Sequence, residues 1–186
     1  MNIRRATAGD AVALAKVHVD SWRSAYRGLV PDSHLDSLDY DRRAQCFRES
    51  LAAGAEEFYI AEDDEGVLGF LSLGACRDPD LAGEPVGEIW AIYLVPRQWR
   101  KGIGRLLCQR SDELLASRHY TQVVLWVFEG NRAARGFYEA VGYASDGVSK
   151  MLNPGTPFKG MRYRKRLIST EPGVSANGGQ TAVAGL

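Results

Sequence analysis

A strand–helix–strand pattern in the middle of the chain restricts the possible folds most strongly. Residues 87–95 form an almost continuous apolar run, which is typical of a strand buried on both faces, and Pro96 ends it. An amphipathic helix is expected from Ile103, and a second apolar strand follows at residues 122–128. Because such a crossover joins parallel strands with a right-handed turn, the pattern predicts a helix packed on a sheet that contains parallel strands.

The segments around this unit indicate further strands and helices. A helix is expected after a capping box formed by Thr7 and Asp10, and another over residues 33–53. Asn131 can cap a helix over residues 132–141. Further strands are expected at residues 3–6, 57–62, 67–75, 143–151 and 160–167. The order of elements predicts an α/β fold with a mixed sheet.

Length and composition indicate one ordinary globular domain. We expect it to span residues 1–168, with residues 169–186, rich in Ser, Thr, Gly and Ala, as a flexible tail. Lys+Arg and Asp+Glu both number 23, so net charge favours neither nucleic acid nor a membrane as partner. The 3 cysteines and 3 histidines lack metal-ligand spacing, so we expect no metal. The cysteine usage and the lack of a signal segment favour a cytoplasmic location.

The loop between the first apolar strand and its helix has the features of an anion site. Gly102 and Gly104 allow a ligand to approach the backbone closely. The first turn of the helix offers unpaired N–H groups and the positive end of the helix dipole. Cationic side chains surround the same point, namely those of Arg97, Arg100, Lys101 and Arg105. The loop therefore predicts a phosphorylated ligand, best a pyrophosphate.

Two common phosphate sites fit the loop poorly. A Walker loop is excluded because no Gly-Lys-Ser/Thr follows the glycines. A dinucleotide-binding Rossmann site remains a rival, since Gly102-x-Gly104 opens a helix and Glu129 could hold a ribose. Against it, Leu107 stands at the third glycine position, and residues 96–101 separate the strand from the first glycine.

Two segments in order resemble the GNAT (GCN5-related) N-acetyltransferases. Residues 92–107 are similar to the acetyl-CoA loop of that family, and residues 131–143 resemble its second signature, Asn-x-x-Ala-x-x-Phe-Tyr-Glu-x-x-Gly-Phe. Trp99 departs from the pattern, which usually has Arg or Gln three residues before the first glycine. The resemblance covers about residues 2–168. It implies a mixed central sheet flanked by about four helices, with parallel central strands that splay apart.

The resemblance also implies a donor, an acceptor and a set of contacts. The donor would be acetyl-CoA, and the acceptor a small-molecule or protein amine that receives the acetyl group directly in a ternary complex. Family habit suggests a homodimer. Pantetheine would pair with the backbone of Ile92, Tyr93 and Leu94, and Asn131 would contact the cofactor. The pyrophosphate would lie on Arg100, Lys101, Gly102, Ile103, Gly104 and Arg105.

Two residues are candidates for proton transfer. Tyr138 matches the family's tyrosine acid, and a phenol is protonated at neutral pH and can donate to a leaving thiolate. Its alternative role is that of a core aromatic. Glu88 is the carboxylate of the first apolar strand and a candidate base. Without a bulge it shares a strand face with Trp90 and Ile92; its alternative role is a solvated carboxylate at the strand entry.

The acceptor cannot be identified from the chain. Aromatic residues between the first two helices and the central strands could contact it or could simply form core: Trp22, Tyr26, His34, Trp90 and Trp126. Two other functions remain open. One is a non-catalytic acyl-CoA-binding or regulatory module on the same fold, and the other is a nicotinamide-dependent oxidoreductase.

Overall fold

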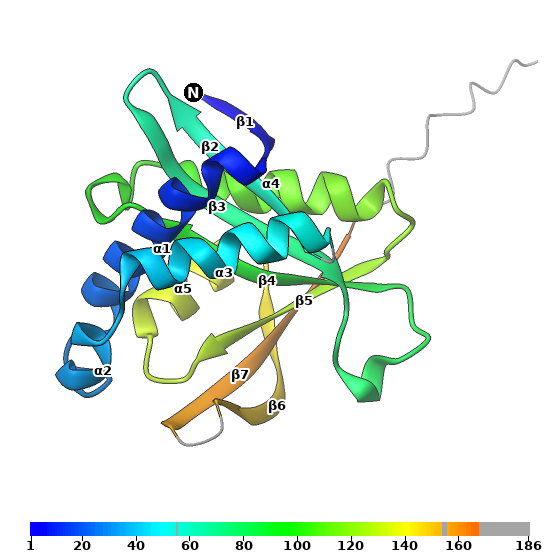
Figure 1. Cartoon of the computed structure of the whole chain (residues 1–186). Helices are drawn as coiled ribbons and strands as arrows, with labels where there is room; N and C mark the ends of the chain where they lie inside the picture. Colours follow the sequence, from blue (N-terminus) through cyan, green and yellow to red (C-terminus); the bar gives the residue numbers. More distant parts are fainter. Residues whose placement is uncertain (55, 154–155, 168–186) are drawn as a thin grey trace, which may run out of the picture.

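A mixed sheet forms the centre of the molecule (Figure 1). The computed structural model describes residues 1–54, 56–153 and 156–167, and in these residues the sheet has seven strands in the order β1-β2-β3-β4-β5-β7-β6. The strands are β1 Asn2–Arg5, β2 Glu57–Asp63, β3 Gly66–Ala75, β4 Val86–Leu94, β5 Gln122–Phe128, β6 Ala144–Asn153 and β7 Thr156–Arg166. Only β4 and β5 run parallel among these neighbours, which confirms the mixed sheet. The expected tail at residues 169–186 lies outside the described residues.

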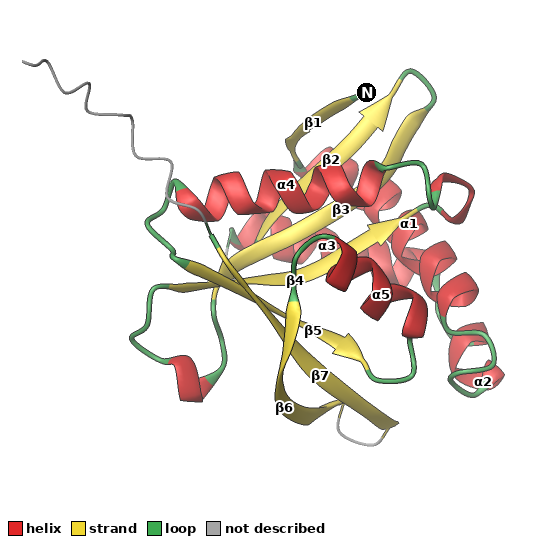
Figure 2. Ribbon diagram, turned by 180° about the vertical axis from the view of Figure 1, so that it is seen from behind, coloured by secondary structure: helices red, strands yellow, loops and turns green. Residues whose placement is uncertain are grey.

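Helices cover both faces of the sheet. The described residues form five helices, against about four expected: α1 Ala11–Ala25, α2 Asp32–Asp36, α3 Tyr40–Ala53, α4 Ile103–Ala116 and α5 Arg132–Ala140. Helices α1 and α3 lie on one face (Figure 1), and α4 and α5 lie on the other (Figure 2). No helix in the described part of the chain is long and apolar enough to cross a bilayer.

The single helix expected over residues 33–53 is wrong. The helical conformation is interrupted between α2 and α3, where Asp39 has an extended backbone. Its carboxylate accepts a hydrogen bond of 2.7 Å from the backbone N–H of Arg42, so it caps the start of α3. The capping box before α1 is confirmed, because the Asp10 carboxylate accepts a hydrogen bond of 2.7 Å from the backbone N–H of Thr7.

The two parallel strands pair over only part of their length. Among the described residues, β4 and β5 are in register from Val86↔Gln122 to Ile89↔Leu125, where the pairing ends. By contrast, β4 remains paired with β3 as far as Leu94, which lies opposite Gly69. The edge of β4 that faces β5 is therefore open from Trp90 to Leu94. This opening confirms the expected splay of the central strands.

A β-bulge at Trp90 changes the faces of β4. Ser72 lies opposite Ala91 and Leu73 lies opposite Ile89, so Trp90 is the extra residue. The expectation that Glu88 and Ile92 share a face therefore fails, because a bulge shifts the alternation of side chains by one residue. Ile92 packs against the hydrophobic cluster that contains Ile89.

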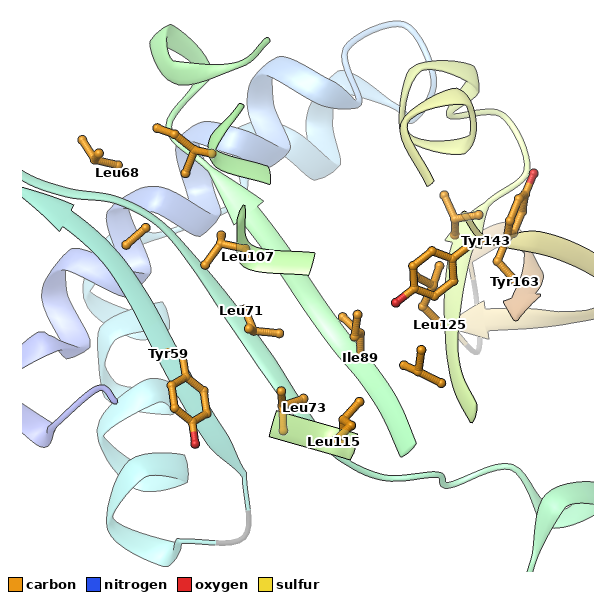
Figure 3. Close-up of a cluster of buried hydrophobic side chains, with 14 residues drawn as sticks. Tyr59, Leu68, Leu71, Leu73, Ile89, Leu107, Leu115, Leu125, Tyr143 and Tyr163 are labelled. Atoms are coloured by element: carbon orange, nitrogen blue, oxygen red, sulfur yellow. The ribbon is translucent and has the colours of Figure 1, made fainter. Parts of the chain in front are cut away.

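The sheet separates two hydrophobic cores. Figure 3 shows the core between the sheet and α4, in which Ile89 and Leu125 of the parallel strands meet Leu107 and Leu115 of the helix. A second core under α1 and α3 contains Leu14, Phe47, Ile60 and Phe70. Burying one such side chain contributes about 1.5–3 kcal/mol, so the two cores fix the strands on either side of the opening.

Candidate active site

The loop before α4 has an unusual backbone. Residues Pro96–Gln98 form a 3₁₀ turn, and then Arg100 (φ 62°) and Gly102 (φ 88°) both adopt left-handed conformations. This conformation is favourable for glycine and costs a residue with a Cβ about 1–2 kcal/mol. Backbone strain of this kind is held by the surrounding structure and clusters at ligand sites.

The N-terminus of α4 offers hydrogen-bond donors that have no partner among the described residues. Gly102 is the N-cap and has no side chain to cap the N–H groups of Ile103, Gly104 and Arg105. The first N–H bonded within the helix is that of Leu106, which donates to the carbonyl of Gly102 at 3.2 Å. A Cβ added to Gly102 would meet no atom within 4 Å. The N-terminus of α4 therefore combines open space with N–H groups that can bind a ligand.

The cationic residues of the loop are oriented toward solvent. Arg100, Lys101 and Arg105 are exposed, whereas the side chain of Ile103 is buried in the α4 core. The side chain of Ile103 is thus unavailable to a ligand, and its contribution would be its backbone N–H. Exposed cations around three free amides at a helix N-terminus fit a diphosphate well.

The two glycines of the loop have different surroundings. A Cβ on Gly104 would lie 3.1 Å from Cζ of Phe137 and 3.4 Å from Cδ1 of Leu94. Gly104 is buried and lets α4 approach α5 and the end of β4 closely. The sequence predicts that both glycines allow a ligand to approach the backbone closely. At Gly104, however, the close contacts are with the protein itself.

The open edge of β4 exposes alternate peptide groups. The N–H of Val95 donates to Leu68 of β3 at 2.9 Å, and backbone direction alternates along a strand. The peptide groups of Tyr93 consequently face β3, while those of Ile92 and Leu94 face the opening. Of the three residues expected to pair with pantetheine, Ile92 and Leu94 have peptide groups that face the opening, whereas those of Tyr93 face β3. The pairing itself stays a prediction.

The side chain of Trp99 hydrogen-bonds to one of these open peptide groups. Its indole Nε1–H donates a hydrogen bond of 3.0 Å to the carbonyl oxygen of Leu94. The residue that departs from the family pattern thereby ties the loop to the end of β4. Within the described part of the chain, the N–H and C=O of Ile92 and the N–H of Leu94 remain available to a ligand.

Tyr138 lies next to this edge. It packs against the same hydrophobic cluster as Ile92 and Leu94, and its ring meets those of Phe137 and Tyr143 at centroid distances of 5.1 and 5.8 Å. Burial of the phenol raises the pKa of Tyr138 well above its ordinary value, so the hydroxyl keeps its proton at neutral pH. Its half-buried position is compatible with both predicted roles, acid and core aromatic.

Asn131 is a helix cap. Its side-chain oxygen accepts a hydrogen bond of 3.0 Å from the backbone N–H of Ala134, so it stabilises the first turn of α5. The cofactor contact expected for Asn131 stays a prediction. By holding the start of α5, Asn131 also helps to fix the position of Tyr138 on that helix.

Glu88 is buried and paired with Arg77. Its side chain is only 3% exposed. Its carboxylate accepts three hydrogen bonds from Arg77: from the backbone N–H at 2.9 Å, from Nε at 3.2 Å and from Nη2 at 2.8 Å. The guanidinium also lies over the Trp90 ring, 4.6 Å from its centroid. The solvated strand-entry carboxylate considered as the alternative is therefore excluded.

The aromatic residues expected near the acceptor fall into two groups. Trp22, Tyr26 and His34 meet in one cluster with Phe128 and Phe158, and part of this cluster is core. Trp90 and Trp126 lie apart from it, each as the first residue after the last parallel pair of its strand. They border the point where β4 and β5 separate.

Sequence reasoning missed the charged partners of these tryptophans. Arg77 lies over Trp90, and Lys150 lies over Trp126, 3.9 Å from the ring centroid. Asp78 accepts a hydrogen bond of 2.9 Å from the indole N–H of Trp126. No local pattern marks these residues, because their partners are up to 84 positions away along the chain.

The fold and site together define a class of protein. Splayed parallel strands, an uncapped helix N-terminus and a cationic loop are together typical of an acyl-CoA-dependent transferase. The sequence profile described as "Acetyltransferase (GNAT) family" matches residues 17–143, and the chain belongs to that family. It is an N-acetyltransferase of the GNAT type, and acetyl-CoA is the donor.

Individual relatives agree with this assignment. The chain is 34% identical over 141 residues to an uncharacterized N-acetyltransferase, YuaI, of Bacillus subtilis, covering 75% of this chain and 78% of that protein. It is 30% identical over 156 residues to a probable N-acetyltransferase of Mycobacterium tuberculosis, covering 83% and 86%. The fold is similar to that of the PaiA N-acetyltransferase of Thermoplasma acidophilum in complex with coenzyme A, with a TM-score of 0.72, 19% identity and coverage of 89% and 98%.

Proposed function

We propose that this enzyme moves an acetyl group from acetyl-CoA to a primary amine by direct transfer in a ternary complex. One arrangement carries the proposal: the open edge of β4 leads to the uncapped N-terminus of α4, with Tyr138 packed beside that edge. A long ligand with a diphosphate at one end and amides along its length matches these donors and acceptors in order. Holding both reactants side by side supplies much of the acceleration in such reactions.

The chain's own residues would have the following roles in binding and catalysis. Acetyl-CoA supplies an activated acetyl group as a thioester. Ile92 and Leu94 orient the amide-bearing arm through their open peptide groups, and the amides of α4 hold the diphosphate. Tyr138, whose pKa is raised by burial, carries the proton that the departing thiolate needs.

Glu88 is the proposed proton acceptor for the amine. It lies at the bulge on the other face of the sheet from Ile92, so donor and acceptor would meet across the opening between β4 and β5. The three hydrogen bonds from Arg77 occupy both carboxylate oxygens. Proton transfer to Glu88 would therefore require at least one bond to Arg77 to open, which makes Arg77 part of the proposal.

A panel of primary amines with acetyl-CoA tests the function. We expect thiol release that depends on the amine, together with an N-acetylated product. Removing a general acid typically costs 10²–10⁴-fold, so we expect Tyr138→Phe to lower kcat about 10²-fold while CoA affinity stays within twofold. Binding of CoA without turnover on any amine, in wild type and Tyr138→Phe alike, would instead indicate a non-catalytic acyl-CoA-binding module.

A further inference from the structure

An ammonium group is already bound beside the opening, and it belongs to the protein. The Nζ of Lys150 lies 3.9 Å from the centroid of the Trp126 ring and donates a hydrogen bond of 2.6 Å to Oδ1 of Asp78. An aromatic face and a carboxylate are the two groups that bind an organic ammonium best. Trp126 and Asp78 therefore form a cation site, with Lys150 as its occupant.

The carboxylate of this site is held independently of Lys150. The Asp78 side chain is 3% exposed and accepts hydrogen bonds from Nε1 of Trp126 at 2.9 Å and from Nη1 of Arg162 at 3.2 Å. Arg162 is equally buried and also pairs with Asp80 at 2.8 Å and Asp146 at 2.6 Å. Strands β5 and β7 thus fix the position of Asp78 whether or not Lys150 is present.

Lys150 is the replaceable member of the group. It lies on β6, the edge strand of the sheet, and its side chain is 46% exposed. Figure 1 shows β6 and β7 extending beyond α1 and α3, so the lysine reaches its site from an outer strand. A long flexible side chain can move to solvent at low cost. Asp78 keeps its hydrogen bonds from Trp126 and Arg162 when the lysine leaves.

The site has a definite place relative to the reaction. Trp126 directly follows Leu125, the last residue of β5 paired with β4. Strand alternation sets Trp126 on the face opposite Leu125, and Leu125 belongs to the hydrophobic cluster against which Tyr138 packs. The ammonium site therefore lies beside the start of the opening, on the face away from the proposed proton donor.

We propose that Trp126 and Asp78 bind a second cationic group of the acceptor, which displaces Lys150. The inference rests on the proposed function and narrows its acceptor to amines that carry another ammonium, such as diamines and polyamines. One amine of such a molecule loses its proton and attacks the thioester. The other stays charged between the indole ring and the carboxylate and holds the acceptor in place.

Two matched probes test this proposal: 1,4-diaminobutane and n-butylamine, titrated calorimetrically into the protein saturated with CoA. Lys150→Ala removes the internal competitor, which is held by one ion pair and one cation–π contact. It should tighten 1,4-diaminobutane binding about fivefold and leave n-butylamine binding within twofold. Lys159→Ala is the control, because Lys159 lies on the adjacent strand and pairs with the half-exposed Glu129. It should change neither affinity.

A second variant tests the aromatic member of the site and leaves the buried Asp78 unchanged. Adding Trp126→Leu to Lys150→Ala should abolish the gain for 1,4-diaminobutane. The proposal is overturned if Lys150→Ala changes both amines equally or neither. Selective diamine binding without any acetylated product would uphold this site and contradict the proposed function, whereas acetylation of n-butylamine with unchanged diamine preference would do the reverse.

Discussion

The indole N–H of Trp99 donates a hydrogen bond of 3.0 Å to the carbonyl oxygen of Leu94. This contact connects the residue that departs from the GNAT pattern to the strand that would hold pantetheine. It anchors the loop immediately before the left-handed residues Arg100 and Gly102. It also removes one acceptor from the open edge of β4, so the loop and the edge are coupled.

Trp99→Phe should therefore weaken CoA binding. The change keeps an aromatic ring and removes the hydrogen bond, which is worth about 0.5–1.5 kcal/mol, so we expect a loss of affinity of about two- to thirteenfold. Because the side chain is 37% exposed, the melting temperature should change little. Calorimetry with CoA checks the prediction. An affinity equal to that of wild type would mean that the contact does not position the loop.

The two glycines of the loop should respond differently to alanine. Gly102→Ala places a Cβ in open space at φ 88°, so we expect about 1 kcal/mol of backbone strain and a clear loss of CoA affinity, about tenfold. Gly104→Ala pushes against Phe137 and Leu94, so it should lower the free energy of unfolding by about 1–3 kcal/mol.

Chemical denaturation and CoA titration of both variants separate these effects. The assignment of Gly102 to the ligand would be contradicted if Gly102→Ala bound CoA like wild type. The assignment of Gly104 to packing would be contradicted if Gly104→Ala were as stable as wild type.

Glu88→Gln tests the proposed proton acceptor. The variant keeps the shape of the side chain but loses its charge and its ability to accept a proton, so we expect kcat/KM to fall about 10²-fold. Arg77→Gln is the matched control, because it removes the two hydrogen bonds from the guanidinium and leaves the carboxylate and the backbone N–H bond of residue 77 in place. If the Glu88→Gln variant kept its rate and lost only stability, Glu88 would have only the structural role of holding Arg77.

His18 should make the protein sensitive to mild acid. It is buried next to Trp22 and Tyr93, and burial, with a smaller contribution from Arg43, lowers the pKa of His18 from 6.5 to about 3. Below pH 6.5 the unfolded chain binds a proton that the folded protein does not, so stability is full above pH 6.5 and falls toward pH 3. The slope is about 1.4 kcal/mol per pH unit, or about 2 kcal/mol between pH 6.5 and 5.

His18→Phe should remove most of that slope. The buried Nδ1 of His18 has no hydrogen-bond partner among the described residues, so its loss leaves no group unpaired. Urea denaturation of both proteins between pH 7 and 5 measures the difference. Equal slopes in the two proteins would show that His18 can bind a proton in the folded state.

Local motifs allowed much of the fold, and the loop and helix N-terminus of the candidate donor site, to be predicted. The strand, glycine loop and helix around Gly102 lie within a short stretch, and short-range patterns determine such units. The bulge at Trp90 could not be predicted, because it depends on how β4 pairs with β3. For the same reason, the sequence did not distinguish the peptide groups of Tyr93, which face β3, from those of Ile92 and Leu94.

The cluster of Asp78, Trp126, Lys150 and Arg162, which we propose binds part of the acceptor, was the least predictable part. Asp78 comes from the connection between β3 and β4, whereas Trp126, Lys150 and Arg162 come from three other strands. Only the folded sheet brings these residues together. The break between α2 and α3 does have a local signal, because Asp39 is a favourable N-cap residue and caps α3.

Mass spectrometry of a reaction with isotopically labelled acetyl-CoA and a panel of mono- and diamines tests the central claim most directly. We predict that the label appears in an N-acetylated amine with an equal amount of free CoA, and that the intact enzyme gains no acetyl mass during turnover. A labelled acetyl-enzyme that later passes its label to the amine, or CoA binding with no labelled product, would contradict direct transfer in a ternary complex.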